Sequence, residues 1–105
     1  MATQQQRAIA ALRNVHITSD VGDVDQPTIK VSKLMGEQVT WSTTGNKATI
    51  VFDAPEGSPF QHGAFEVPAG GSVSSGLAKA SASGSYKYTV VGSSGKNDPI
   101  VIVDP

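Results

Sequence analysis

The chain has 105 residues, a formal net charge of -1 and no cysteine. This length fits one domain that can bury a sizeable core without a disulfide or a metal to hold it. Because only 16% of the residues are charged, the chain lacks the basic field that attracts nucleic acid. The absence of cysteine excludes disulfides, cysteine-ligated zinc and thiol chemistry.

Residues 1–14 form an extension that precedes the rest of the pattern. Residues 4–12 are good helix formers and Asn14 can end a helix, so a short N-terminal helix is predicted. Three roles stay open for it: a frayed end, a cap on one end of the domain, or a segment that binds a partner. With no signal peptide and no membrane span, we expect a soluble, cytoplasmic chain, or a periplasmic or secreted one if a leader has been removed.

From residue 15 onward, apolar and polar residues alternate, which is the pattern of half-buried β-strands. The predicted strands fall at residues 15–18, 29–32, 38–42, 48–52, 65–67, 86–90 and 100–103. The last is a continuous apolar run, which suits a strand covered on both faces. In the Gly/Ser/Ala-rich stretch at 70–85, predicted as an edge strand plus a loop, only Val73 and Leu77 are large enough for the core. About seven to eight short strands predict an all-β sandwich or barrel over residues 15–105.

Several segments occur together in the order and spacing of one known superfamily. They read Thr-Ile-Lys-Val at 28–31, Gly-Glu-Gln-Val-Thr-Trp at 36–41, Ala-Thr-Ile-Val-Phe-Asp at 48–53, Phe-Glu-Val-Pro-Ala-Gly-Gly-Ser at 65–72, Gly-Ser-Tyr-Lys-Tyr-Thr-Val at 84–90 and Asp-Pro-Ile-Val-Ile-Val at 98–103. This series resembles the cupredoxins, the plastocyanin-like blue-copper proteins. The resemblance implies a Greek-key β-sandwich for nearly the whole domain.

The resemblance also locates the residues that would bind copper, and none of them suits a type 1 centre. By position they are Ala48, Val90, Ser93 and Asn97 or its neighbour Asp98. A type 1 centre needs two imidazoles, a thiolate and a weak axial ligand. The resemblance therefore implies a member of the superfamily that lacks the type 1 ligands, binds no cofactor and does not transfer electrons through copper.

Another metal site is a weaker alternative. The only imidazoles are His16, predicted on the outward face of a strand, and His62, predicted in a loop. Zinc takes three or four protein ligands, so these two would need carboxylates such as Asp53 or Glu66. Two exposed or hydrogen-bonded histidines are the simpler interpretation. A divergent copper- or zinc-binding protein that uses His62 and carboxylates is kept as an alternative function.

The sequence favours a protein that is not an enzyme. The serines lie in Gly/Ser/Ala loops without a Gly-x-Ser-x-Gly elbow, and no acidic residue has the apolar neighbours that would raise its pKa strongly. An enzyme with an unrecognised carboxylate site is a further alternative.

A non-catalytic binding, structural or accessory role is therefore expected. The resemblance puts the loops at 43–48 and 92–98 at the pole where cupredoxins dock partners, so an unknown protein or small ligand is expected there. Phe60, if exposed beside His62, would form an apolar interaction surface; alternatively, Phe60 folds over one end of the sandwich. Trp41 and at least one tyrosine are predicted to lie in the core.

Overall fold

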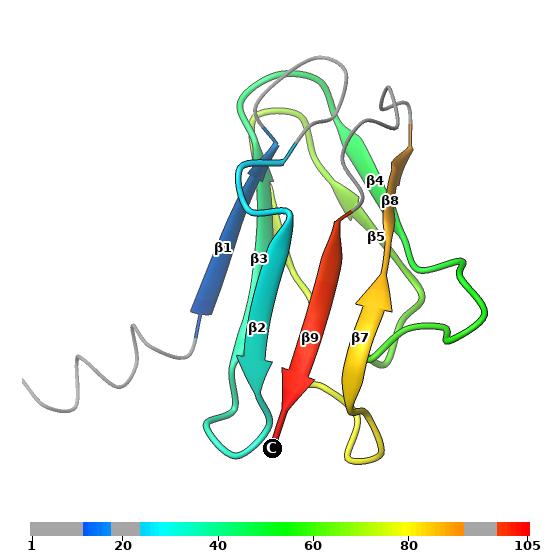
Figure 1. Cartoon of the computed structure of the whole chain (residues 1–105). Helices are drawn as coiled ribbons and strands as arrows, with labels where there is room; N and C mark the ends of the chain where they lie inside the picture. Colours follow the sequence, from blue (N-terminus) through cyan, green and yellow to red (C-terminus); the bar gives the residue numbers. More distant parts are fainter. Residues whose placement is uncertain (1–11, 18–23, 92–98) are drawn as a thin grey trace, which may run out of the picture.

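The computed structural model describes residues 12–17, 24–91 and 99–105, which form nine β-strands in two packed layers (Figure 1). The strands are β1 (Leu12–Ile17), β2 (Thr28–Ser32), β3 (Gln38–Thr43), β4 (Ala48–Val51), β5 (Ala64–Val67), β6 (Ser72–Ser74), β7 (Gly84–Lys87), β8 (Thr89–Val91) and β9 (Ile100–Asp104). This part of the chain includes no helix that is long and apolar enough to cross a membrane. The all-β fold predicted from the sequence is confirmed.

One layer has the strand order β1-β3-β6, and the other combines β2-β9-β7 with β5-β4-β8. The two halves of the second layer meet where β7 passes into β8, with only Tyr88 between the two strands. The Tyr88 N–H donates to the Pro99 carbonyl at 3.0 Å instead of continuing either ladder. The pairs β1–β3 and β2–β9 are parallel, so the chain crosses between the layers rather than folding as simple hairpins.

The domain begins earlier than the sequence indicates. β1 starts at Leu12, so residues 12–14 belong to the sandwich and not to an N-terminal extension that ends at residue 14. Arg13 lies opposite Val39 in the parallel ladder, and its guanidinium donates to the Glu37 carboxylate at 2.8 Å. This pairing with a distant strand outweighs the local preference for helix. The remainder of the predicted helix, up to residue 11, lies outside the described residues.

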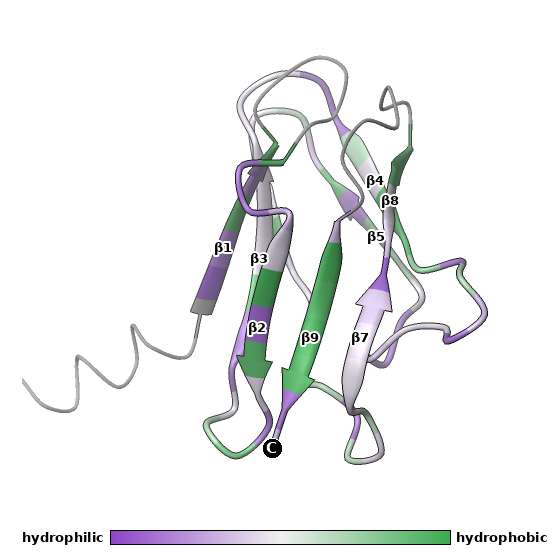
Figure 2. Cartoon of the chain, in the orientation of Figure 1, coloured by the Kyte–Doolittle hydropathy of each residue, from purple (hydrophilic) through white to green (hydrophobic). Residues whose placement is uncertain are grey.

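Two expectations about apolar residues were wrong. In β9, Val101 and Val103 are buried while Ile100 and Ile102 are only half-buried, so the strand is covered fully on one face alone. Figure 2 shows the apolar character of this strand. Leu77, expected to be one of two core-sized residues in its stretch, is 57% exposed.

The core is organised around Trp41. The indole is fully buried and contacts the rings of Phe52, Phe60, Phe65 and Tyr88, with ring centroids 5.3 to 6.3 Å apart. Trp41 comes from β3 in one layer, whereas Phe65 comes from β5 in the other. The predicted core positions of Trp41 and of one tyrosine are confirmed, since Tyr88 is 3% exposed and Tyr86 is half-buried.

Tyr88 carries a polar atom into this apolar cluster. Its hydroxyl and the Trp41 Nε1 are both buried without a hydrogen-bond partner among the described residues. Burial raises the pKa of the Tyr88 hydroxyl from its ordinary 10.0 to about 12; the nearby Trp41 indole N–H partly offsets the rise, and the charge of Asp25 adds to it. The two rings meet edge to face, with centroids 5.6 Å apart and an interplanar angle of 72°.

We expect Trp41→Ala to lower the free energy of unfolding by about 3–5 kcal/mol, because it removes the ring that fills the space between the layers. Urea unfolding followed by circular dichroism measures this change. Val91→Ala is the control, since Val91 is 56% exposed and surface substitutions usually change stability by about 0.5 kcal/mol or less. A loss below about 1 kcal/mol for Trp41→Ala, close to the effect of a surface substitution, would contradict the central role of this residue.

Stability should fall as the pH rises above 10. An unfolded tyrosine loses its proton near pH 10, while folded Tyr88 keeps its proton until about pH 12. Between these values the unfolded chain binds fewer protons, so Tyr88 lowers the free energy of unfolding by up to about 1.4 kcal/mol per pH unit. Urea unfolding at a series of pH values tests this effect, and Tyr88→Phe should flatten the decline. Equal slopes for the two proteins would show that Tyr88 is not the titrating group.

Candidate functional site

Of the positions that the sequence resemblance aligned with copper ligands, two are described, and both are core residues. Ala48 on β4 is 8% exposed and Val90 on β8 is 3% exposed. In the antiparallel β4–β8 ladder, Val90 lies opposite Ile50, which is fully buried. Since residues two apart on a strand share a face, Ala48 and Ile50 point into the interior with Val90. This end of the core is therefore filled with hydrocarbon, and neither residue has a lone pair for a metal. The remaining positions, Ser93 and Asn97, lie outside the described residues.

The loops beside this end of the sandwich are held by hydrogen bonds. The Thr43 hydroxyl accepts from the Gly45 N–H at 3.2 Å and donates to the Asn46 carbonyl at 3.2 Å. The Thr43 N–H donates to the Gly71 carbonyl at 3.0 Å, and the Gly70 N–H donates to the Gly45 carbonyl at 3.1 Å. These bonds tie the loop after β3 to the loop before β6. We call residues 43–47 and 68–71 the loop pole.

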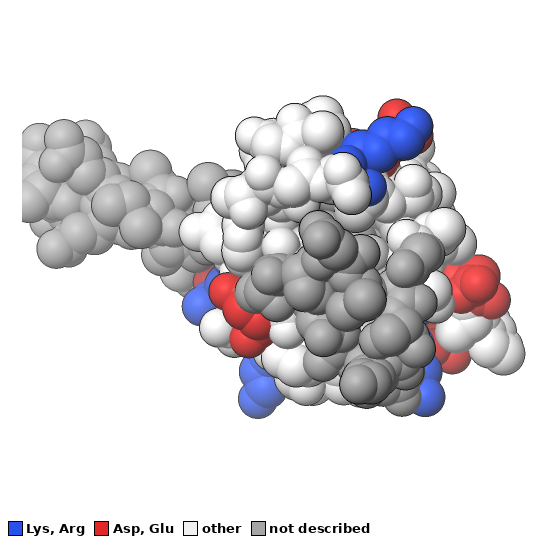
Figure 3. Space-filling model, turned by 90° about the horizontal axis from the view of Figure 1, so that it is seen from above, with Lys and Arg blue, Asp and Glu red and all other residues white. Residues whose placement is uncertain are grey.

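The electrostatics of the loop pole are weak. Figure 3 looks down on this end and shows charged side chains of both signs spaced around its rim. No single-sign field is visible there of the kind that would steer a highly charged ligand. The described part of the loop pole offers backbone amides, carbonyls and hydroxyls together with the exposed Lys47, which suit hydrogen bonding better than binding of a soft metal ion.

The ring and the main chain of His16 both form hydrogen bonds within the domain. It lies on β1 opposite Ser42 of β3, and its Nδ1 is 3.0 Å from the Ser42 Oγ. Its backbone N–H donates to the Asp25 Oδ1 at 2.8 Å, and the Asp25 N–H donates to the His16 carbonyl at 2.9 Å. In a catalytic triad the carboxylate would hold the ring, whereas here Asp25 binds the main chain. The outward orientation of His16 was predictable from its strand, but its partner was not, because cross-strand register is not visible in one sequence.

His62 and Ala48 lie at opposite ends of the β4–β5 hairpin. It is exposed, and its ring is perpendicular to that of Phe65 with centroids 6.3 Å apart. His62 lies near the Val51–Ala64 end of the β4–β5 hairpin, whereas Ala48 pairs with Val67 at the other end. Three residues of strand separate these ends, a distance of about 10 Å. The described residues include no group of three His, Cys, Asp or Glu side chains that could hold a metal ion.

Phe60 is in the interior, so it cannot form an exposed surface with His62. It is fully buried, bridges to Ala78 and packs against Trp41. Of the two alternatives that the sequence left open, the structure has the one in which Phe60 folds over the core. The candidate interaction surface at this loop thus retains only His62.

Sequence reasoning missed a groove of mixed polar and apolar lining at the end of the sandwich opposite the loop pole. The groove has a volume of about 290 Å³ and is lined by the turn at residues 33–37 and by Leu77 and Ala78. Nothing local to the Met35-Gly36 turn indicated that Leu77 would remain exposed beside it.

Comparison with known proteins identifies the fold. No protein-family model matches the chain, and no curated protein matches its sequence. Among solved structures, the chain is similar to a novel purple cupredoxin from Nitrosopumilus maritimus, with 16% identity, a TM-score of 0.61 and coverage of 87% of this chain and 98% of that one. It is also similar to an oxidised amicyanin mutant, with 18% identity, a TM-score of 0.62 and coverage of 90% and 84%.

A mutant plastocyanin of fern matches with 18% identity and a TM-score of 0.52, covering 88% of this chain and 100% of that one. All three similarities extend over most of both chains, and they are structural rather than sequence-level. The chain therefore has the cupredoxin fold.

Proposed function

We propose that this protein is a copper-free cupredoxin-like domain with a non-catalytic binding, structural or accessory role, and that it does not transfer electrons through copper. The observation that carries the proposal is the burial of Ala48 and Val90 in the core. A type 1 centre is built around a copper thiolate, and the whole chain contains no cysteine. The loss of the thiolate therefore does not depend on the conformation of any loop.

The loop pole is the surface that we propose for binding a protein or a small ligand. Its support is the set of hydrogen bonds that hold Thr43, Gly45 and Gly71 in place. A ligand that meets a preformed surface loses less affinity to the ordering of loops. The uncharged amides and hydroxyls of these turns favour a ligand that is recognised by hydrogen bonding.

A metal titration tests the first part of the proposal. Protein purified without chelator should contain no stoichiometric copper or zinc by elemental analysis, and calorimetric titration with either ion should show no tight site. The competing function uses His62 and carboxylates. Stoichiometric, tight binding that His62→Ala abolishes and the matched control His16→Ala preserves would replace the proposed function with a metal-binding one.

The packing role of Val90 can be tested with a substitution that keeps its shape. Val90→Thr places a hydroxyl in an apolar site, which should lower the free energy of unfolding by about 1–3 kcal/mol. The adjacent Val91→Thr is a matched control on the exposed face of β8, and its effect should be about 0.5 kcal/mol or less. Thermal and urea unfolding measure both. Equal effects for the two variants would mean that position 90 is not a packing position.

A further inference from the structure

The outer face of the β1-β3-β6 layer carries two serines that are hydrogen-bonded to neighbouring strands. Residues of β3 alternate between half-buried and buried, so Gln38, Thr40 and Ser42 share the outer face. The strand register places His16 of β1 opposite Ser42 and Ser74 of β6 opposite Thr40. Two hydrogen bonds cross this face. The His16 Nδ1 is 3.0 Å from the Ser42 Oγ, and the Ser74 hydroxyl donates to the Gln38 Oε1 at 2.9 Å.

The two serine hydroxyls differ in the group that they meet. In the tautomer that carries its proton on Nε2, the His16 Nδ1 accepts from the Ser42 hydroxyl, and such a nitrogen can take up the proton as a general base. The amide oxygen that accepts from Ser74 is only a hydrogen-bond acceptor. Ser74 is exposed, whereas Ser42 is half-buried. Accessibility alone therefore predicts that Ser74 is the more reactive serine, and activation by a base predicts Ser42.

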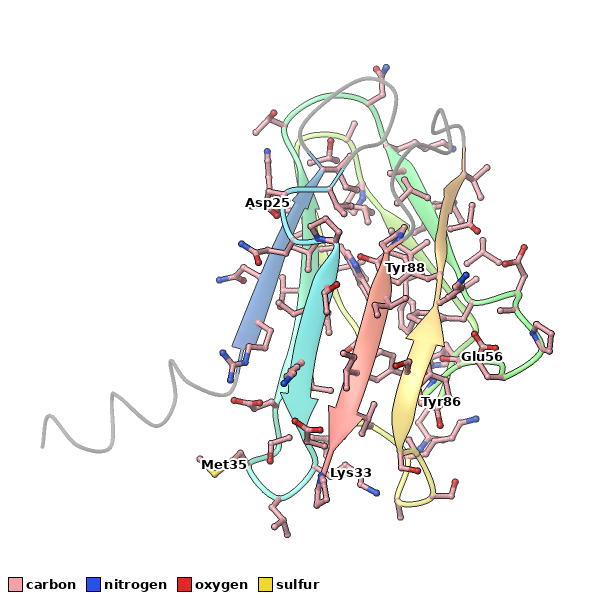
Figure 4. The ribbon with its side chains drawn as sticks, viewed as in Figure 1. Asp25, Lys33, Met35, Glu56, Tyr86 and Tyr88 are labelled. Carbon is pink, nitrogen blue, oxygen red and sulfur yellow. The ribbon has the colours of Figure 1, made fainter. Side chains whose placement is uncertain are left out.

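The position of His16 relative to Ser42 is fixed by its main chain. The His16 N–H donates to the Asp25 Oδ1 at 2.8 Å, and the Asp25 N–H donates to the His16 carbonyl at 2.9 Å. Figure 4 shows Asp25 next to the upper part of β1. The flanking residues Val15 and Ile17 are both buried in the core. Because the strand is held on both sides of the ring, the base stays close to the hydroxyl that it would deprotonate.

A third side chain lies next to Ser42 on the same face. Ser72 of β6 is directly opposite Ser42 in the antiparallel ladder, which puts the two Cβ atoms about 4.5–5.5 Å apart. Its hydroxyl can donate to the oxygen of an acyl group that is attacked at the Ser42 Oγ. One hydroxyl stabilises a developing oxyanion less than a pair of backbone N–H groups would. The arrangement therefore suits an acyl donor with a good leaving group and not a peptide.

We propose that Ser42 is a site of covalent acylation by an activated ester or thioester, with His16 as the general base. The Ser42 Oγ forms a bond to the acyl carbon, and the bond from that carbon to the leaving alcohol or thiol breaks. The hydroxyl proton passes through the His16 Nδ1 to the leaving group. The products are an acyl-serine and a free alcohol or thiol, and no oxidant or reductant is consumed.

This inference goes beyond the proposed function. It concerns a single modification of the outer face of the β1-β3-β6 layer and not turnover of a substrate. It depends neither on a ligand at the loop pole nor on the residues aligned with copper ligands.

Acetylation of the full-length protein by p-nitrophenyl acetate tests the proposal. Peptide mass mapping after acid quenching measures the rate at each serine. Ser42 should be acetylated at least about tenfold faster than Ser74, since a positioned general base contributes about 100-fold to 10,000-fold. Ser74 is the matched internal control, because it lies on the same face and donates to an amide in place of an imidazole.

A substitution of the base provides the second measurement. His16→Gln keeps a polar side chain but removes the group that accepts the proton. It should lower the rate at Ser42 by at least about tenfold and leave the rate at Ser74 unchanged. Circular dichroism would verify that the variant retains its β-sheet. If it does not fold, the ratio of the Ser42 rate to the Ser74 rate in the unaltered protein still decides.

Three outcomes would overturn the proposal. Equal rates at Ser42 and Ser74 in the unaltered protein, or a faster rate at Ser74, would show that accessibility and not a base governs the reaction. An unchanged rate at Ser42 in folded His16→Gln protein would show that the imidazole takes no proton. An acetyl group found on the His16 ring and not on Ser42 would make the imidazole itself the nucleophile.

Discussion

The packing of Trp41 between the two layers is the interaction on which the rest of the fold depends. Its indole is contributed by β3, and the rings around it are contributed by the loop that follows β4, by β5 and by the residue between β7 and β8. Buried aromatic rings contribute large apolar areas and prefer edge-to-face contacts, and most of these pairs have that geometry. The two layers are thus held by hydrophobic packing within the chain. A domain stabilised in this way needs no metal to connect its layers.

This core explains how the fold can be stable without a copper site. Ala48 and Val90 belong to the same buried cluster as Trp41 and Ile50, so each position adds apolar contacts instead of a polar atom that would need a partner. A buried histidine or thiolate without a metal would be costly in such surroundings. Both positions therefore contribute packing to the core. The packed core thus supports the loops at residues 43–47 and 68–71.

The sequence predicts this core well, because its signals are local. Alternation around Val39, Trp41 and Ile50 is sufficient to define buried faces, and the order of the motifs is sufficient to align Ala48 and Val90 with ligand positions. The features that were missed depend on residues distant in sequence. β1 begins at Leu12 because that segment pairs with β3, His16 meets Ser42 through the same register, and Leu77 is exposed because the described core closes without it. A single sequence does not show which strands are neighbours, so it shows none of these.

The buried carboxylate of Glu37 connects these non-local features at one point. It receives the Arg13 guanidinium from β1 and the Ser32 N–H from β2, while Glu37 itself directly precedes β3. A buried carboxylate is tolerated only when charged or hydrogen-bonding partners satisfy it, so the starts of β1 and β3 and the end of β2 are constrained to meet there. Since Glu37 also lines the groove at residues 33–37, the ion pair that fixes the register of β1 also ties this strand to the turn between β2 and β3.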